Sequence, residues 1–98
     1  MAIDLAQQSG NRVIIRYGNT NTSVSGKLIG FTPKAVFVQD GHFVKIFFDK
    51  NGSLRSAGTQ IHVTSEEVLM FGNCVGLKRN GSVALYDEEG KPAGRKQI

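Results

Sequence analysis

Tight turns built on glycine divide this chain into short segments, and this feature restricts its fold more than any other. Asp40-Gly41 favours a two-residue hairpin turn, because Asp and Gly tolerate the positive φ angles that such turns require. The segment from Asp49 to Gly52 is a second turn signal of this kind. Between the turns, apolar residues occur in short runs that alternate with polar ones, which is typical of strands. The sequence therefore predicts an all-β protein built from hairpins.

Individual strands can be assigned from the same alternation. Gly26 and Gly30 fall inside one expected strand and indicate strong bending or a close approach of another backbone. Residues 18–23 are expected to form a polar turn, and residues 2–8 carry the one helical pattern, which predicts a short N-terminal helix. The expected strands are residues 12–17, 24–31, 34–39, 42–48, 59–63, 68–71 and 82–86.

The second half of the chain partly repeats the first. A shift of 40 residues aligns two aromatic positions, two apolar strand positions and two glycine turns: Phe31 with Phe71, Phe37 with Leu77, and Asp40-Gly41 with Asn80-Gly81. A shift of 38 aligns the turn after Phe48 with the turn after Tyr86. Two explanations remain open, namely tandem duplication of a hairpin unit and independent reuse of turn residues in a β-meander.

Chain length and the terminal segments define the domain. Ninety-eight residues suffice for one core, so we expect a single small domain over residues 1–98. Residues 91–98 are basic without a hydrophobic period and are expected to form a flexible tail. No apolar run approaches the roughly 20 residues that cross a bilayer, and the N-terminus lacks the order of a signal peptide. The sequence therefore predicts a cytoplasmic protein that does not associate with membranes.

Few residues suggest catalysis or metal binding. One cysteine and two histidines cannot complete a four-ligand zinc site within one chain, and no phosphate-binding glycine loop is present. Cys74 with His42 or His62 would make a catalytic dyad. The residues around Cys74 do not resemble an activating helix N-terminus, so a half-buried strand cysteine is the favoured interpretation. We expect a non-enzymatic protein without a metal or another cofactor.

Positive charge and aromatic residues together indicate a nucleic-acid ligand. Twelve Lys and Arg against eight Asp and Glu give a net charge of +4, which attracts polyanions. Alternation over residues 42–48 places Phe43, Lys45 and Phe47 on one strand face, where rings stack on bases and the ammonium group meets phosphate. Lys78-Arg79 precedes a turn, and two further cations lie in the expected tail. The expected nucleic-acid-binding residues are Phe43, Lys45, Lys78, Arg79, Arg95 and Lys96.

The same residues also fit a second function. A strand with apolar residues on two faces is found where two layers or two subunits enclose it, with Lys45 extending to water. Phe43 and Phe47 would then form the interface of a homo-oligomer, and Lys78-Arg79 would protect a sheet edge from aggregation. The sequence thus leaves two candidates: a binder of single-stranded RNA or DNA, with RNA preferred, and a protein assembly module without a nucleic-acid role.

Residues 12–39 resemble the first sequence motif of the Sm and Sm-like RNA-binding proteins. The resemblance rests on the alternating first strand, on the G-K-L-I-G-F sequence from Gly26 to Phe31, and on the apolar strand that follows. It departs from the family at Thr32, where the family has Asp, and no I-R-G-like second motif is present. The resemblance implies a strongly bent, Sm-like or SH3-like small barrel that forms rings and binds single-stranded RNA. An additional C-terminal hairpin region would extend this barrel.

Overall fold

The protein is almost entirely β-structure. The computed structural model describes residues 3–57 and 60–97, and these residues form twelve strands. The strands are β1 (Ile3–Ser9), β2 (Arg12–Tyr17), β3 (Thr20–Ser25), β4 (Lys27–Phe31), β5 (Ala35–Asp40), β6 (Phe43–Lys50), β7 (Ser53–Ser56), β8 (Ile61–His62), β9 (Glu67–Phe71), β10 (Cys74–Arg79), β11 (Ser82–Tyr86) and β12 (Pro92–Gln97). The prediction of an all-β protein is confirmed.

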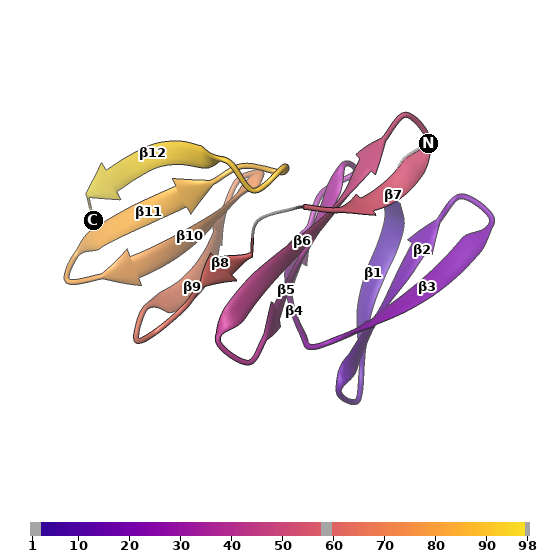
Figure 1. Cartoon of the computed structure of the whole chain (residues 1–98), viewed down its shortest axis with the longest axis horizontal. Coiled ribbons are helices and arrows are strands. Elements are labelled where there is room, and N and C mark those ends of the chain that lie inside the picture. Colours follow the sequence, from indigo (N-terminus) through magenta and orange to yellow (C-terminus); the bar gives the residue numbers. More distant parts are fainter. Residues whose placement is uncertain (1–2, 58–59, 98) are drawn as a thin grey trace.

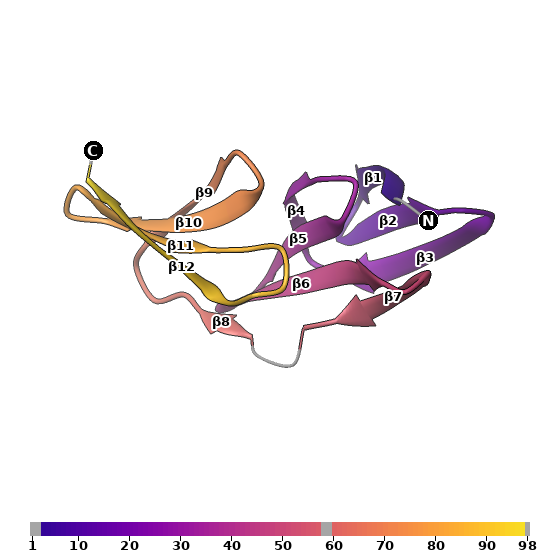
Figure 2. The same ribbon diagram turned by 90° about the horizontal axis from the view of Figure 1, so that it is seen from above.

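The strands form three antiparallel sheets that follow the order of the sequence. Sheet A contains β1, β2 and β3; sheet B contains β4 to β7, with β8 paired to β6; sheet C contains β9 to β12. The sheets are stacked along the longest dimension of a molecule that measures 42 × 28 × 21 Å, with sheet B in the middle (Figure 1). Figure 2 shows the same order from a second direction. Short glycine turns explain this order, because each one returns the chain beside the strand it has just left.

Sheet B contributes residues to both hydrophobic cores. In β5, Ala35 and Phe37 pack with residues of sheet C, whereas Val36 and Val38 pack with residues of sheet A. All four side chains are fully buried. Successive strand residues point to opposite faces, so a continuous apolar run is what a strand between two layers requires.

The sheets do not close into a barrel within residues 3–57 and 60–97, so the predicted barrel is wrong. The expected strand 24–31 is interrupted at Gly26, where φ is 131° and the chain passes from sheet A to sheet B. A Cβ atom at Gly26 would lie 2.8 Å from the carbonyl oxygen of Gln39, which confirms the close backbone approach expected there. The expected polar turn at residues 18–23 is confirmed only at Gly18 and Asn19, because Thr20–Ser25 is β3.

The N-terminal segment is a strand and not the predicted helix. Ile3–Ser9 pairs with β2 along its length, and Ala2 lies outside the described residues. Ile3 and Ala6 are buried in the core between sheets A and B, and the Ile3 amide donates to the carbonyl of Pro33 over 2.8 Å. Helical order in so short a segment is weak, so this burial decides its conformation. In the part of the chain that the structure describes, no helix is long and apolar enough to cross a membrane.

The basic C-terminal segment is also ordered. Pro92–Gln97 pairs with β11 as β12, which contradicts the flexible tail expected there; Ile98 lies outside the described residues. Every β12 side chain is exposed, so backbone pairing and not burial holds the strand. The preceding turn is fixed by Asp87, whose Oδ1 accepts the amides of Glu89 and Lys91, each over 2.9 Å. The order of β12 therefore comes from the turn and from the edge of β11.

Candidate functional site

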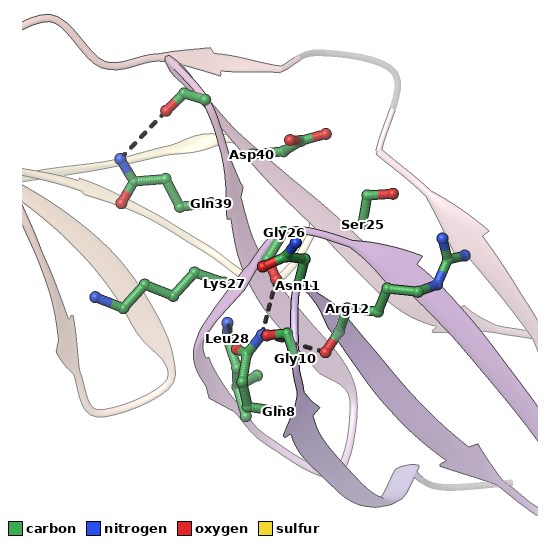
Figure 3. A pocket seen from close by; sticks show the side chains of 11 residues that line it. Gln8, Gly10, Asn11, Arg12, Ser25, Gly26, Lys27, Leu28, Gln39 and Asp40 are labelled. Carbon is green, nitrogen blue, oxygen red and sulfur yellow. Dashed lines mark hydrogen bonds between the residues drawn. The ribbon is translucent and has the colours of Figure 1, made fainter.

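A hollow with a volume of about 980 Å³ lies where sheets A and B meet (Figure 3). Its polar side chains include Arg12, Lys27 and Gln8. Figure 3 shows Arg12 and Lys27 pointing in different directions, and Arg12 donates to the Ser23 hydroxyl over 3.2 Å. These two cations therefore do not converge on one ligand.

Gln8 has a structural role in this hollow. Its Nε2 donates to the carbonyls of Gly10 and Gly26, each over 3.0 Å, and its Oε1 accepts the Leu28 amide over 2.6 Å. These contacts attach β1 to the point where the chain enters sheet B. The polar atoms of Gln8 are already bonded to the backbone. The hollow is therefore better explained as the place where β1 is hydrogen-bonded to the start of sheet B than as a ligand site.

A smaller cleft gathers two of the predicted cations. It has a volume of about 290 Å³ and lies between β8 and the strands of sheet C. We define the arginine cleft by His62, Arg79, Tyr86 and Arg95, which all line it. Strand register explains this grouping. Leu77, Ala84 and Arg95 are successive cross-strand neighbours, and Arg79 follows Leu77 by two residues, so both arginines lie on the face of sheet C that carries Leu77.

Phe43 lies beside the arginine cleft. It pairs with His62 across β6 and β8, and the two ring centroids are 5.3 Å apart. Phe43 is 41% exposed, which leaves part of its ring open to a ligand. The rings of Phe43 and His62 thus extend the cleft onto sheet B.

The other two residues of the predicted aromatic face are occupied. Phe47 packs against the core between sheets A and B, so the interpretation of this face as one enclosed between two layers is confirmed at Phe47. Lys45 forms an ion pair with Asp40, with 3.0 Å between Nζ and Oδ2. Neither residue joins Phe43 at the arginine cleft.

Lys78 and Lys96 lie on the opposite face of sheet C from the cleft. Lys78 pairs with Val83, and Val83 pairs with Lys96, so the three share the outer face. The Lys96 ammonium lies 6.0 Å from the centroid of the Phe71 ring. The structure therefore separates Lys78 from Arg79 although they are adjacent in sequence, because neighbouring strand residues point to opposite faces.

An acidic group adjoins the two arginines. Glu66 lines the cleft, and its Oε1 accepts the Thr64 hydroxyl over 2.6 Å and the Ser65 amide over 3.0 Å. The bond from the Thr64 side chain, followed by the bond from the Ser65 backbone, lowers the pKa of Glu66 to about 2. The carboxylate is therefore charged at neutral pH. Residues 64–65 form a bend that leads into β9.

Sequence reasoning missed two members of the cleft. His62 was considered only as a partner of Cys74, and Tyr86 only as part of a repeated turn. Cys74 is half-buried on the outer face of sheet C opposite Phe71, as expected for a packing residue. Among residues 3–57 and 60–97, no three His, Cys, Asp or Glu side chains are grouped as a metal site would require.

Comparison with models of protein families, with curated proteins and with solved structures finds no match to this chain. Its function is therefore inferred from its own residues.

Proposed function

We propose that this protein binds single-stranded nucleic acid, with RNA as the expected ligand, through the arginine cleft and the adjoining ring of Phe43. One observation carries the proposal: Arg79 and Arg95 line the same cleft as the rings of His62 and Tyr86. Guanidinium groups match phosphate geometry, and aromatic rings stack on unpaired bases of any sequence. This combination is typical of surfaces that recognise single strands.

The shape and charge of the cleft suggest how a strand would lie. About 290 Å³ is at the lower end of ligand-pocket volumes, so one nucleotide would enter while its neighbours cross the surface. Phe43 and His62 provide rings for a following base. The Glu66 carboxylate repels phosphate and accepts hydrogen bonds, so base amino groups are expected on its side and phosphates beside the arginines. The protein is a binding module in this proposal, and no catalytic step is assigned to it.

Removal of the arginines tests the electrostatic part. The measurement is fluorescence anisotropy with a labelled mixed-sequence RNA of about 10 nucleotides, repeated over a series of salt concentrations. The double variant Arg79→Ala with Arg95→Ala should bind more weakly and reduce the salt slope by about 1 to 1.5, because each arginine neutralises about one phosphate. The control is the double variant Lys34→Ala with Lys50→Ala, which removes the same charge near the end of β6 that is far from Phe43. It should keep the salt slope of the wild-type protein.

Removal of a ring tests the stacking part. Phe43→Ala should weaken binding about 5- to 100-fold at an unchanged salt slope, because stacking releases no counterions. Equal effects of the arginine and lysine double variants would reduce the interaction to general charge attraction. If the wild-type protein does not bind single strands at physiological salt, the nucleic-acid proposal fails and the assembly module becomes the better explanation.

A further inference from the structure

The two outer faces of the stack differ in polarity. On sheet A, register places Arg12, Ile14 and Arg16 on the outer face, between Leu5 of β1 and the polar residues Ser25, Ser23 and Asn21 of β3; Leu5 and Ile14 are exposed there. On sheet C, the outer face carries the partly exposed Leu69, Phe71 and Leu85 around the fully buried Val83. Sheet C ends the stack in Figure 1, so an apolar face lies at one end of the molecule and a more polar face at the other. Apolar sheet faces are usually covered by another layer.

Large and small residues alternate across this outer face. Leu69, Gly76, Leu85 and Gly94 are successive neighbours across the four strands. The space above Gly76 is filled by the Phe71 ring, because a Cβ atom at Gly76 would lie 2.6 Å from both Phe71 Cδ2 and Val83 Cγ1. The space above Gly94 is open, with no atom within 4 Å of such a Cβ. The face therefore carries Leu69 and Phe71 on β9, Leu85 on β11 and open space at Gly94 of β12.

Charge is distributed across the same face with opposite signs at its two edges. The next row of cross-strand neighbours is Glu67, Lys78, Val83 and Lys96. Glu67 lies on β9 and Lys96 on β12, which are the two edge strands of sheet C. The two ends of this row are complementary to those of its reversed copy, which also places Lys78 opposite Val83.

We propose that a second copy of this chain covers the outer face of sheet C, related by a twofold axis that runs along the strands between β10 and β11. This axis reverses the order of the strands and keeps the rows in register. It places Leu69 opposite the open space at Gly94 of the second copy, and Glu67 opposite the second copy's Lys96. Sheets that pack face to face interdigitate large and small residues in this way. The contact is isologous, since each copy uses the same surface.

Within the chain, sheet C already packs face to face on sheet B with its other face. The 40-residue shift maps β4 onto β9, and both strands begin a meander of the same order. Phe37 and its counterpart Leu77 lie in one core, where sheet B faces sheet C. The proposed dimer uses the opposite face of sheet C and leaves the more polar faces of sheet A at its two ends. Arg79 and Arg95 lie on the other face of sheet C, so the dimer does not depend on the nucleic-acid proposal.

The oligomeric state of full-length variants tests this interface. Sedimentation of the wild-type protein up to about 100 μM should show a dimer. Leu69→Asp should give a folded monomer, because a carboxylate would be buried at the interface without a partner. Ile14→Asp is the control, since it places the same charge on the outer face of sheet A, and it should leave the dimer unchanged. Far-UV circular dichroism establishes that each variant is folded.

A charge exchange gives a second test at two exposed positions. Glu67→Lys and Lys96→Glu should each raise the dimer dissociation constant about tenfold, and the double variant should restore it. A wild-type monomer at about 100 μM would overturn the proposal. The proposal would also be overturned if the Leu69→Asp variant still formed the dimer. The same holds if the double charge variant dimerised no more tightly than the single variants, because the interface would then lie elsewhere. Protection of the Leu69 face by RNA in a monomer would assign that face to nucleic acid instead.

Discussion

At the scale of single residues, a hydrogen bond from a buried tyrosine helps to connect sheets A and B. The Tyr17 hydroxyl of β2 donates to Asp49 Oδ1 of β6, and the same oxygen accepts the Gly52 amide over 3.2 Å. Tyr17 is buried in the core between the two sheets. Burial, then the hydrogen bond to Asp49 and the charge of that carboxylate, raise the pKa of Tyr17 to about 12. The neutral hydroxyl is therefore part of the folded structure.

This shift predicts a loss of stability in alkali. An unfolded tyrosine titrates near pH 10, so between about pH 10 and 12 the folded state holds the Tyr17 proton more strongly than the unfolded state does. The stabilising effect is fully present below pH 10 and is lost as the pH rises through 12. We expect Tyr17→Phe to be less stable than wild type at neutral pH and to lose less stability over this interval. Urea unfolding across the pH range measures both effects, and an unchanged alkaline loss in the variant would contradict the assignment.

Two glycines with positive φ allow backbone strain to be separated from crowding. Gly10 has a φ of 59° and open space where a Cβ would lie, whereas Gly26 has a φ of 131° and a Cβ there would lie 2.6 Å from Val38 Cγ1. Gly10→Ala should cost about 1 kcal/mol for its left-handed backbone alone. Gly26→Ala should cost about 2 to 4 kcal/mol, because β5 would have to move as well. Chemical denaturation measures the loss of stability in both variants. Equal losses would show that β5 can move away from residue 26 at little cost in free energy.

At the scale of strands and turns, alternation located strands correctly where one segment carries its own signal. Residues 12–17 alternate well enough to predict a strand and form β2 with the expected bounds. The pattern failed at Ile3–Ser9, because the burial of Ile3 and Ala6 depends on sheet B, which the chain forms later. The burial of Val36 and Val38 depends in the same way on sheet A. The local sequence shows which secondary structure a segment favours, but it does not show which sheet will cover the segment in the fold.

The sequence predicts Phe43, Arg79 and Arg95 as site residues, but their grouping around one cleft could not be predicted, for a related reason. Once residues 91–98 were expected to be a flexible tail, Arg95 and Lys96 had no assigned face, and their separation by β12 could not be predicted. A signal was nevertheless present. The turn after Phe48 leads into β7, and its repeat after Tyr86 therefore indicates a further strand, which is β12. With that strand assigned, alternation alone would have separated Arg95 from Lys96.

The turn before β12 predicts how this strand can be released. Asp87→Ala removes two side-chain hydrogen bonds to the backbone, which contribute on the order of 1 kcal/mol together. Amide protection in β12 should fall about three- to tenfold, while protection in β5 should stay unchanged. Glu89→Ala in the same turn is the control, because Glu89 has only a surface ion pair with Lys91 at 3.8 Å. Hydrogen exchange measures both, and equal protection in wild type and Asp87→Ala would show that pairing with β11 alone fixes β12.

At the scale of the whole molecule, sheet B decides how the protein unfolds. Sheet A covers one face of sheet B and sheet C covers the other, so each outer sheet reaches only one core. A single β-sheet without a covering layer does not bury enough apolar surface to be stable. Loss of either outer sheet would also expose half of the buried residues of β5. We therefore expect residues of all three sheets to unfold together.

Two tyrosines allow this cooperativity to be measured, because they lie at opposite ends of the stack. Tyr17 belongs to the core between sheets A and B, and Tyr86 packs against the core between sheets B and C. The chain has no tryptophan and only these two tyrosines, so Tyr17→Phe and Tyr86→Phe each leave one fluorescent reporter. In each variant the tyrosine signal and the far-UV circular dichroism should change with the same midpoint, as a two-state transition requires. If Tyr86 responds at lower denaturant than the far-UV signal, sheet C unfolds separately and the two cores behave as nearly independent repeats. Sheet B would then not couple the two ends of the molecule.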